Sequence, residues 1–193
     1  HISCHYNCLI LLVIFNTNKM SESKSTLKST VLNYGLIMGG LSVAFTLMLF
    51  FMDLHYQNSS IQQWTGLLIM AGSIVFGQLA YKQLNDGFIS LGEGMKIGIG
   101  IVALGSSIGI LYGLFQGYVL DPETMTKAMD YAINEAIKQN PELTDEMIEA
   151  IEGAFEFFAN PFLSSAIGIT VSLFFGCLIS LLTGLAVKKN RPE

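Results

Sequence analysis

The chain has 193 residues, of which 51% are hydrophobic and only 13% are charged, and its formal net charge at pH 7 is −5. This composition excludes an ordinary soluble domain, because such domains carry about 25% charged residues. Nucleic-acid binding is also disfavoured, since ten basic against fifteen acidic residues offer no dense positive surface to phosphates.

The first nineteen residues differ from the rest of the chain, because Met20 opens a polar stretch that is typical of a translation start. We interpret residues 1–19 as a non-native upstream extension of the reading frame, and residues 20–30 as a polar cytoplasmic N-terminus. The apolar run at residues 9–15 is too short to cross a bilayer and has no basic residues before it, unlike a signal peptide. The extension also holds four potential zinc ligands, which we interpret as incidental. These are His1, Cys4, His5 and Cys8.

Four later segments contain no Asp, Glu, Lys or Arg and predict transmembrane helices. Roughly twenty helical residues cross a hydrocarbon core about 30 Å thick, and the core helices of soluble proteins rarely contain apolar runs of that length. We therefore expect an all-α, polytopic membrane protein with one four-helix domain over residues 31–187. A basic cytoplasmic tail is expected at residues 188–193. The predicted spans are residues 31–52, 64–80, 97–120 and 162–187.

The predicted third and fourth spans are separated by an acidic insertion, residues 121–161, with ten carboxylates and two lysines. Apolar residues recur there at three- and four-residue steps, which predicts two amphipathic helices outside the membrane. Asp121 is expected to cap the first helix. The second is expected to begin near Asn140-Pro141 or at Thr144. The acidic faces can be a docking surface for a partner or simply hydrated, and we favour hydration.

The basic residues predict the orientation, because lysine and arginine close to membrane spans stay on the cytoplasmic side. Eight of the ten lie at the two termini or between the second and third spans, which places both termini in the cytoplasm and the acidic insertion outside. This is the arrangement of a bacterial inner-membrane protein. The eight are Lys19, Lys24, Lys28, Lys82, Lys96, Lys188, Lys189 and Arg191.

Small residues recur every four positions in three of the spans. No hydrophobic force drives helices together in lipid, so small side chains that let backbones approach favour close packing. We predict close helix packing through these rows, above all between the third and fourth spans. Leucine at position 109 or 176 is expected to reduce folding yield; a conduction path or an oligomer interface are the alternatives. The rows are Gly35 and Gly39; Gly105, Gly109, Gly113 and Gly117; and Ser164, Gly168, Ser172, Gly176, Ser180 and Gly184.

The sequence offers few groups for chemistry. No ionisable side chain lies inside the predicted spans, which disfavours proton pumping. Asp53 and His55 could share a proton or a metal ion, but two ligands do not make a site, and we interpret them as interfacial residues beside Tyr56 and Trp64. The glycines around Glu93 come after no predicted strand and so do not predict a nucleotide-binding loop. We therefore predict no catalytic residue, no cofactor, no metal and no enzymatic activity.

Two short motifs and the order of features carry a family resemblance. Residues 31–35 read Val-Leu-Asn-Tyr-Gly, and residues 89–98 read Ile-Ser-Leu-Gly-Glu-Gly-Met-Lys-Ile-Gly. With the acidic helical insertion and the Asn-Pro-Phe entry at residues 160–162, the chain resembles the bacterial integral membrane proteins grouped as domain of unknown function family four-one-nine-nine. The resemblance spans roughly residues 28–189. It implies four spans and membrane residence, and no activity.

Two functions from different classes fit these observations. We favour a non-enzymatic protein that resides in the lipid bilayer and assembles with itself or with another envelope protein through its small-residue faces and outer helices. The alternative is a small-molecule transporter or channel subunit. A polar lining beside Ser164, Ser172 and Ser180 would favour transport, whereas a dry contact between glycines would favour assembly.

Overall fold

The computed structural model describes residues 2–142 and 144–190, with side chains from Thr26 onward. Every regular element in this part of the chain is helical, as predicted, and a single isolated β-bridge joins Ile89 to Lys189. In chain order the helices are α1 (Ile2–Phe51), α2 (Ser60–Leu84), α3 (Leu91–Phe115), the π-helical turn η1 (Gln116–Leu120), α4 (Thr124–Gln139), α5 (Asp145–Ala159) and α6 (Pro161–Val187).

Four helical segments are long and apolar enough to cross a membrane, which indicates a multi-pass membrane protein. They are Thr26–Phe51, Ser60–Leu84, Leu91–Leu120 and Pro161–Val187. The second and third begin four and six residues before the predicted spans. A helix starts at its cap, whereas the predicted spans started at Trp64 and Ile97, where the apolar runs begin.

The outward faces of these helices are strongly apolar. Phe76 of α2 is 63% exposed, Leu111 of α3 is 68% exposed and Leu182 of α6 is 67% exposed. Apolar side chains exposed along the whole length of a bundle are typical of helices in contact with lipid. Exposure of the same side chains to water would be unfavourable.

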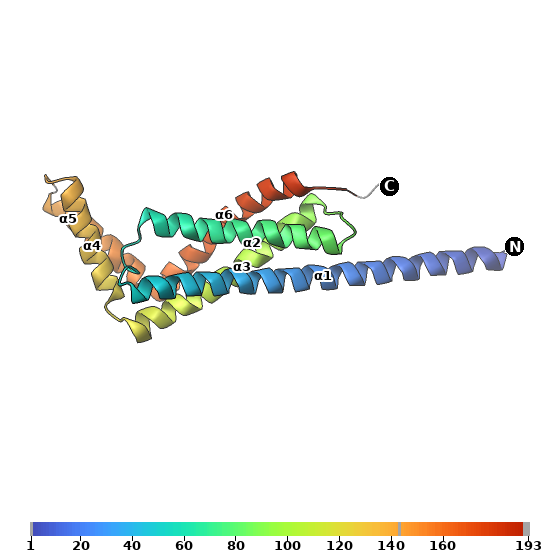
Figure 1. Cartoon of the computed structure of the whole chain (residues 1–193), viewed down its shortest axis with the longest axis horizontal. Helices are drawn as coiled ribbons and strands as arrows, with labels where there is room; N and C mark the ends of the chain where they lie inside the picture. The colour runs from blue at the N-terminus through green and yellow to red at the C-terminus, as the bar shows by residue number, and fades with distance from the viewer. Residues whose placement is uncertain (1, 143, 191–193) are drawn as a thin grey trace.

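Helix α3 is the centre of the bundle, with α1 and α6 packed against it and α2 in contact with all three. In Figure 1, α1 and α2 run nearly parallel while α3 and α6 run obliquely to them, and α4 and α5 project from one end. We call that end the hairpin end. We call the other end the tail end; there α2 stops, α3 starts and α6 finishes.

Local capping explains where α3 and α6 begin. At the start of α3, the Ser90 hydroxyl accepts a hydrogen bond from the Glu93 backbone N–H at 3.3 Å, and the Glu93 carboxylate accepts one from the Ser90 backbone N–H at 2.8 Å. At the start of α6, Asn160 Oδ1 accepts from the backbone N–H of Phe162 at 3.0 Å. Pro161 occupies the first helical position, where a missing N–H is tolerated.

The predicted start of the first insertion helix was wrong. Helix α4 begins at Thr124 with Glu123 as its N-cap, not at Asp121. The Asp121 backbone N–H instead closes the η1 turn on the Gln116 carbonyl at 2.8 Å, and one oxygen of the Asp121 carboxylate bonds His55 and Lys127. Helix α5 begins at Asp145, capped by Thr144, the second of the two expected starts.

The tail end holds the most completely buried part of the protein. Tyr81 is fully buried and donates its hydroxyl to Glu93 at 2.8 Å, and Lys82 Nζ donates to the Val187 carbonyl at 2.8 Å. The backbones of Ile89 and Lys189 exchange two hydrogen bonds of 3.0 Å. These bonds join the ends of α2, α3 and α6. The apolar side chains that lose all contact with solvent are Ile74, Tyr81, Ile97, Ile101 and Val102.

Candidate functional site

The α3–α6 pair is closely packed toward the tail end. A Cβ atom built on Gly98 would lie 2.6 Å from the Cβ of Ser180, and one built on Gly176 would lie 2.7 Å from the Cγ2 of Val102. Real Cβ atoms essentially never approach other atoms this closely. Glycine is therefore required at both positions for the helices to pack as they do. We call this region, residues 94–102 of α3 with 176–184 of α6, the packed half.

Helix α1 packs on α3 in the same manner. A Cβ on Gly35 would lie 2.7 Å from Leu104 Cδ2, and one on Gly39 would lie 2.7 Å from Ile108 Cδ1. In the opposite direction, a Cβ on Gly105 would lie 2.8 Å from the Met38 sulfur. Three glycines from the predicted rows thus face large side chains rather than other glycines.

A buried amide crosses the packed half. Gln78 of α2 donates its Nε2 hydrogens to the Gly94 carbonyl at 3.1 Å and to the Ser180 carbonyl at 3.2 Å. The Ser180 hydroxyl also donates to the Gly94 carbonyl at 3.1 Å. Gly184 lies beside this network, where its Cα would be 3.4 Å from a Cβ on Gly94. The Oε1 atom of Gln78 is buried without a hydrogen-bond partner among the described residues. Three helices therefore meet in a buried, polar contact.

The same rows behave differently toward the hairpin end. A Cβ on Gly109, Gly113, Gly117 or Gly168 would meet no heavy atom within 4 Å. These four glycines, together with Ser164 and Ser172, instead line a cavity of about 810 Å³. We call this region, residues 106–117 of α3 and η1 with 161–172 of α6, the open half.

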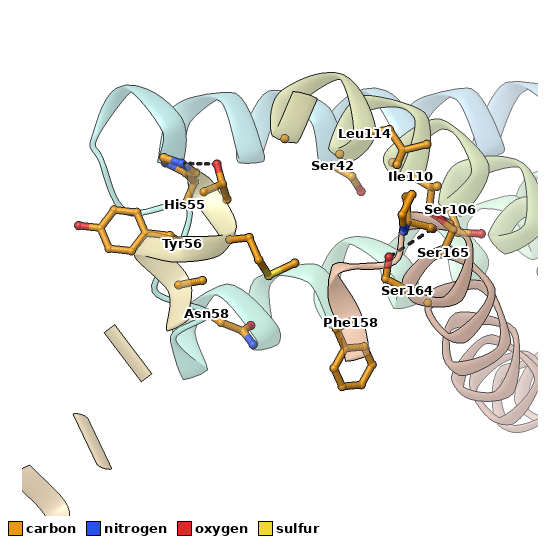
Figure 2. A pocket seen from close by; sticks show the side chains of 18 of the residues that line it. Ser42, His55, Tyr56, Asn58, Ser106, Ile110, Leu114, Phe158, Ser164 and Ser165 are labelled. Carbon is orange, nitrogen blue, oxygen red and sulfur yellow. Dashed lines mark hydrogen bonds between the residues drawn. The ribbon is translucent and has the colours of Figure 1, made fainter. Parts of the chain in front are cut away.

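The cavity lies between the membrane helices and reaches the connecting segments of the hairpin end. Its walls come from α1, α3 and α6, and its end is formed by the α1–α2 loop and the first turns of α4, as Figure 2 shows. A volume of 810 Å³ falls within the range of small-molecule sites, roughly 300–1,000 Å³. No Asp, Glu, Lys or Arg is among the described residues that line it. The larger apolar side chains in the lining are Met38, Ile110, Leu114, Met125 and Phe158.

Hydroxyls are the most frequent polar side-chain groups among the described residues that line the cavity. Ser106 donates to the Val102 carbonyl of its own helix at 2.6 Å, and Ser164 donates to the Pro161 carbonyl at 3.3 Å. Among the described side chains, Ser42 and Ser172 make no hydrogen bond through their hydroxyls, although both line the cavity. The cavity therefore has uncharged hydrogen-bonding groups available to a ligand.

A buried histidine lies at the hairpin end of the cavity. The His55 side chain is 2% exposed, and its Nε2 lies 3.0 Å from the Asp121 carboxylate and 3.3 Å from the Thr124 hydroxyl. Figure 2 shows His55 at one end of the cavity. Lys127 Nζ binds the same carboxylate oxygen at 2.9 Å. His55 Nδ1 is buried and has no partner among the described residues.

The Asp121 carboxylate is held ionised by this cluster. The hydrogen bond from Lys127 keeps its pKa below the ordinary value, with a further lowering from His55, while burial opposes both. The Lys127 ammonium has its pKa raised, chiefly by the same hydrogen bond. The cluster joins the α1–α2 loop to the start of α4. Sequence analysis did not find it, because His55 and Asp121 are 66 positions apart.

The structure does not pair Asp53 with His55. Asp53 is exposed in a left-handed backbone conformation with φ of 56°, and His55 bonds Asp121 instead. Tyr56 packs its ring against His55 with centroids 5.4 Å apart, and Trp64 is 65% exposed. Within residues 26–142 and 144–190, no three His, Cys, Asp or Glu side chains lie close enough to hold a metal ion. The ligand-like side chains at residues 1–8 lie outside the described ones.

Comparison with known proteins gives one match. The model of a family described as "Protein of unknown function (DUF4199)" matches residues 33–189. No curated protein and no solved structure matches the chain. The matched segment includes most of the first candidate span, the other three spans whole, the α4–α5 hairpin and the cavity lining.

Proposed function

The chain belongs to the DUF4199 family of proteins of unknown function, and we propose that it is a non-enzymatic ligand-binding protein of the bacterial inner membrane. The observation that carries this proposal is the cavity of about 810 Å³ in the open half. A bundle held together only for assembly has no need of such a space, and the space is lined by groups that a ligand can bond.

The charge distribution supports an outward-facing cavity. Lys82, Lys188 and Lys189 lie at the tail end, where lysines favour the cytoplasmic side. The acidic helices α4 and α5 project from the opposite end (Figure 1). The cavity therefore opens toward the outer leaflet or the outer surface, and its ligand enters from there.

The geometry around His55 supports binding rather than catalysis. An aspartate bonded to a histidine can serve as a general base when the second ring nitrogen faces a nucleophile. Here the second nitrogen, Nδ1, is buried and has no hydroxyl or thiol partner among the described residues. The Thr124 hydroxyl, which lies 3.3 Å from Nε2, donates to the Asp121 backbone carbonyl at 2.8 Å and so is not arranged as a nucleophile. The cluster holds the loop in place.

Native mass spectrometry of the purified protein tests this function. We expect a bound small molecule on the wild type after incubation with a total lipid extract of the expression host. Gly109→Leu fills the cavity and should lose it, whereas Gly72→Leu is the matched control. Both glycines have open space around a built Cβ, but Gly72 does not line the cavity. Equal adducts on all three proteins, or none on any, would contradict the proposal.

Transport is a second candidate, because Ser164 and Ser172 line the cavity. The path is closed at the tail end, where Ser180 lies in the packed half, so transport requires α3 and α6 to separate there. Efflux from proteoliposomes of the molecule found by mass spectrometry distinguishes the two functions. Wild-type efflux that Gly109→Leu abolishes supports transport, and efflux no faster than in empty liposomes supports binding alone.

Assembly with another copy or an envelope protein remains a third proposal. The glycines of the packed half already contact side chains of this chain, and those of the open half face the cavity. These rows therefore offer little flat surface to a second protein. The exposed apolar residues of α5, such as Met147 and Phe157, are the surface on which assembly would depend.

A further inference from the structure

We propose that the ligand of the cavity is a neutral amphiphile, with an apolar chain and an uncharged head group that bears hydroxyls. This inference rests on the proposed binding function and names the chemical class that the cavity accepts. It is carried by three features: the absence of charged lining residues among those described, the polar groups at one end, and the glycine surface that leads away from them.

The lining excludes a charged ligand. No described Asp, Glu, Lys or Arg side chain lines the cavity, and the Asp121 carboxylate nearby is already bonded by Lys127 and His55. A charge moved from water into such a space would lose its hydration without gaining an ion-pair partner. A neutral molecule loses much less, because hydroxyl and amide groups can replace its hydrogen bonds with water.

The head group belongs at the hairpin end. His55 Nδ1 is a buried acceptor without a donor when Nε2–H donates to Asp121. A buried polar atom without a partner is unfavourable, so a ligand hydroxyl brought to this atom by a small movement of the loop is favoured. Asn58, in the same loop, also lines the cavity, and its side-chain amide makes no hydrogen bond within the described residues. Figure 2 shows Asn58 at the same end as His55.

The apolar chain belongs along α3. From Gly113 to Gly109 the helix advances about 6 Å at about 1.5 Å per residue; both glycines line the cavity, and a Cβ on either would meet no heavy atom within 4 Å. Glycines leave a smooth surface without side-chain projections, and Met38 and Leu114 flank it with apolar groups. A chain laid here would point from the hairpin end into the membrane, as the acyl chain of a lipid does.

Equilibrium binding of three probes with the same acyl chain tests the ligand class. The probes are 1-oleoylglycerol, which is neutral, oleate, which is anionic, and oleoylcholine, which is cationic. We expect 1-oleoylglycerol to bind the wild type and Gly72→Leu at least tenfold more tightly than either charged probe. Gly109→Leu should bind none of them specifically.

Asn58→Gly tests the head-group end. Glycine keeps the left-handed backbone at this position, φ of 44°, but removes the amide. We expect it to weaken 1-oleoylglycerol binding about fivefold, the value of one hydrogen bond of about 1 kcal/mol, and to leave oleate binding unchanged. Unchanged 1-oleoylglycerol affinity would contradict the placement of the head group.

The outcomes separate this inference from the proposed function. Equal or tighter binding of a charged probe, lost in Gly109→Leu, would overturn the neutral class but keep the site. Binding of 1-oleoylglycerol that Gly109→Leu retains would overturn the inference. In that case the mass-spectrometry comparison still decides whether the cavity binds another molecule.

Discussion

The packed half and the open half of the α3–α6 pair are built from the same kind of sequence but differ in what they do. In the packed half, glycine is required because Ser180 and Val102 occupy the space that a side chain would need. In the open half, Gly109 and Gly168 face a cavity. A row of small residues therefore indicates that a helix face is smooth, but not whether another helix or a ligand lies against it.

Helix geometry explains why one row serves both purposes. A step of four residues advances about 40° beyond a full turn, so a row that extends over many steps winds around its helix. Two such helices can stay in contact only over a limited length before their rows face apart. Residues 176–184 of α6 lie in the contact with α3, and residues 164–172 lie beyond it, on the cavity.

The largest effects are expected in the packed half, where even one added methyl group has no space. Gly98→Ala should destabilise the protein by about 2 kcal/mol, because the new methyl group would overlap Ser180 and force α3 and α6 apart. Thermal unfolding in detergent measures this. The double variant Gly98→Ala with Ser180→Gly should recover part of the loss, since it removes the overlapping side chain. A wild-type unfolding midpoint for Gly98→Ala alone would mean that the halves do not differ.

Leucine substitutions in the packed half and in the open half test directly whether the two halves differ in free space. Gly176→Leu should lose about 1–3 kcal/mol, because its Cβ would lie 2.7 Å from Val102. Gly109→Leu should be as stable as the wild type or more so, since leucine favours helix more than glycine does and nothing lies within 4 Å. Folding yield and unfolding midpoint in membranes distinguish the two. An equal loss at both positions would show that the cavity is not open.

The two halves also show how far local sequence patterns can predict this molecule. The four spans and the two insertion helices are predictable from apolar run length and periodicity, which are local properties. The sequence analysis expected leucine to be harmful at both Gly109 and Gly176, and only Gly176 has the close neighbour that this expectation requires. The cavity depends on how far α6 stays beside α3, and the His55–Asp121 pair depends on which loops meet. The spacing of residues along the chain therefore predicts neither the cavity nor this pair.

The loop cluster at the end of the open half should respond to acid. Because the folded-state pKa of Asp121 is lowered, its ionised form stabilises the fold above the unfolded pKa, and this contribution is lost as pH falls through the folded value. Asp121→Asn should remove the ion pair and cost about 1 kcal/mol near pH 7, a modest value because Lys127 is partly exposed. The difference in unfolding midpoint between wild type and variant should shrink below about pH 4. A constant difference down to about pH 2 would contradict the assignment.

The smallest effect is expected at a fully buried polar side chain. Gln78 is fully buried and donates to Gly94 and Ser180, yet its Oε1 atom has no partner among the described residues. Hydrogen bonds between membrane helices contribute only about 0.6 kcal/mol on average, and removing the unsatisfied oxygen offsets part of that loss. Gln78→Met, which keeps the length of the side chain, should therefore shift the unfolding free energy by less than about 1 kcal/mol. A loss well above that, measured beside Gly98→Ala, would mean that the amide, and not the glycine contact, holds the packed half together.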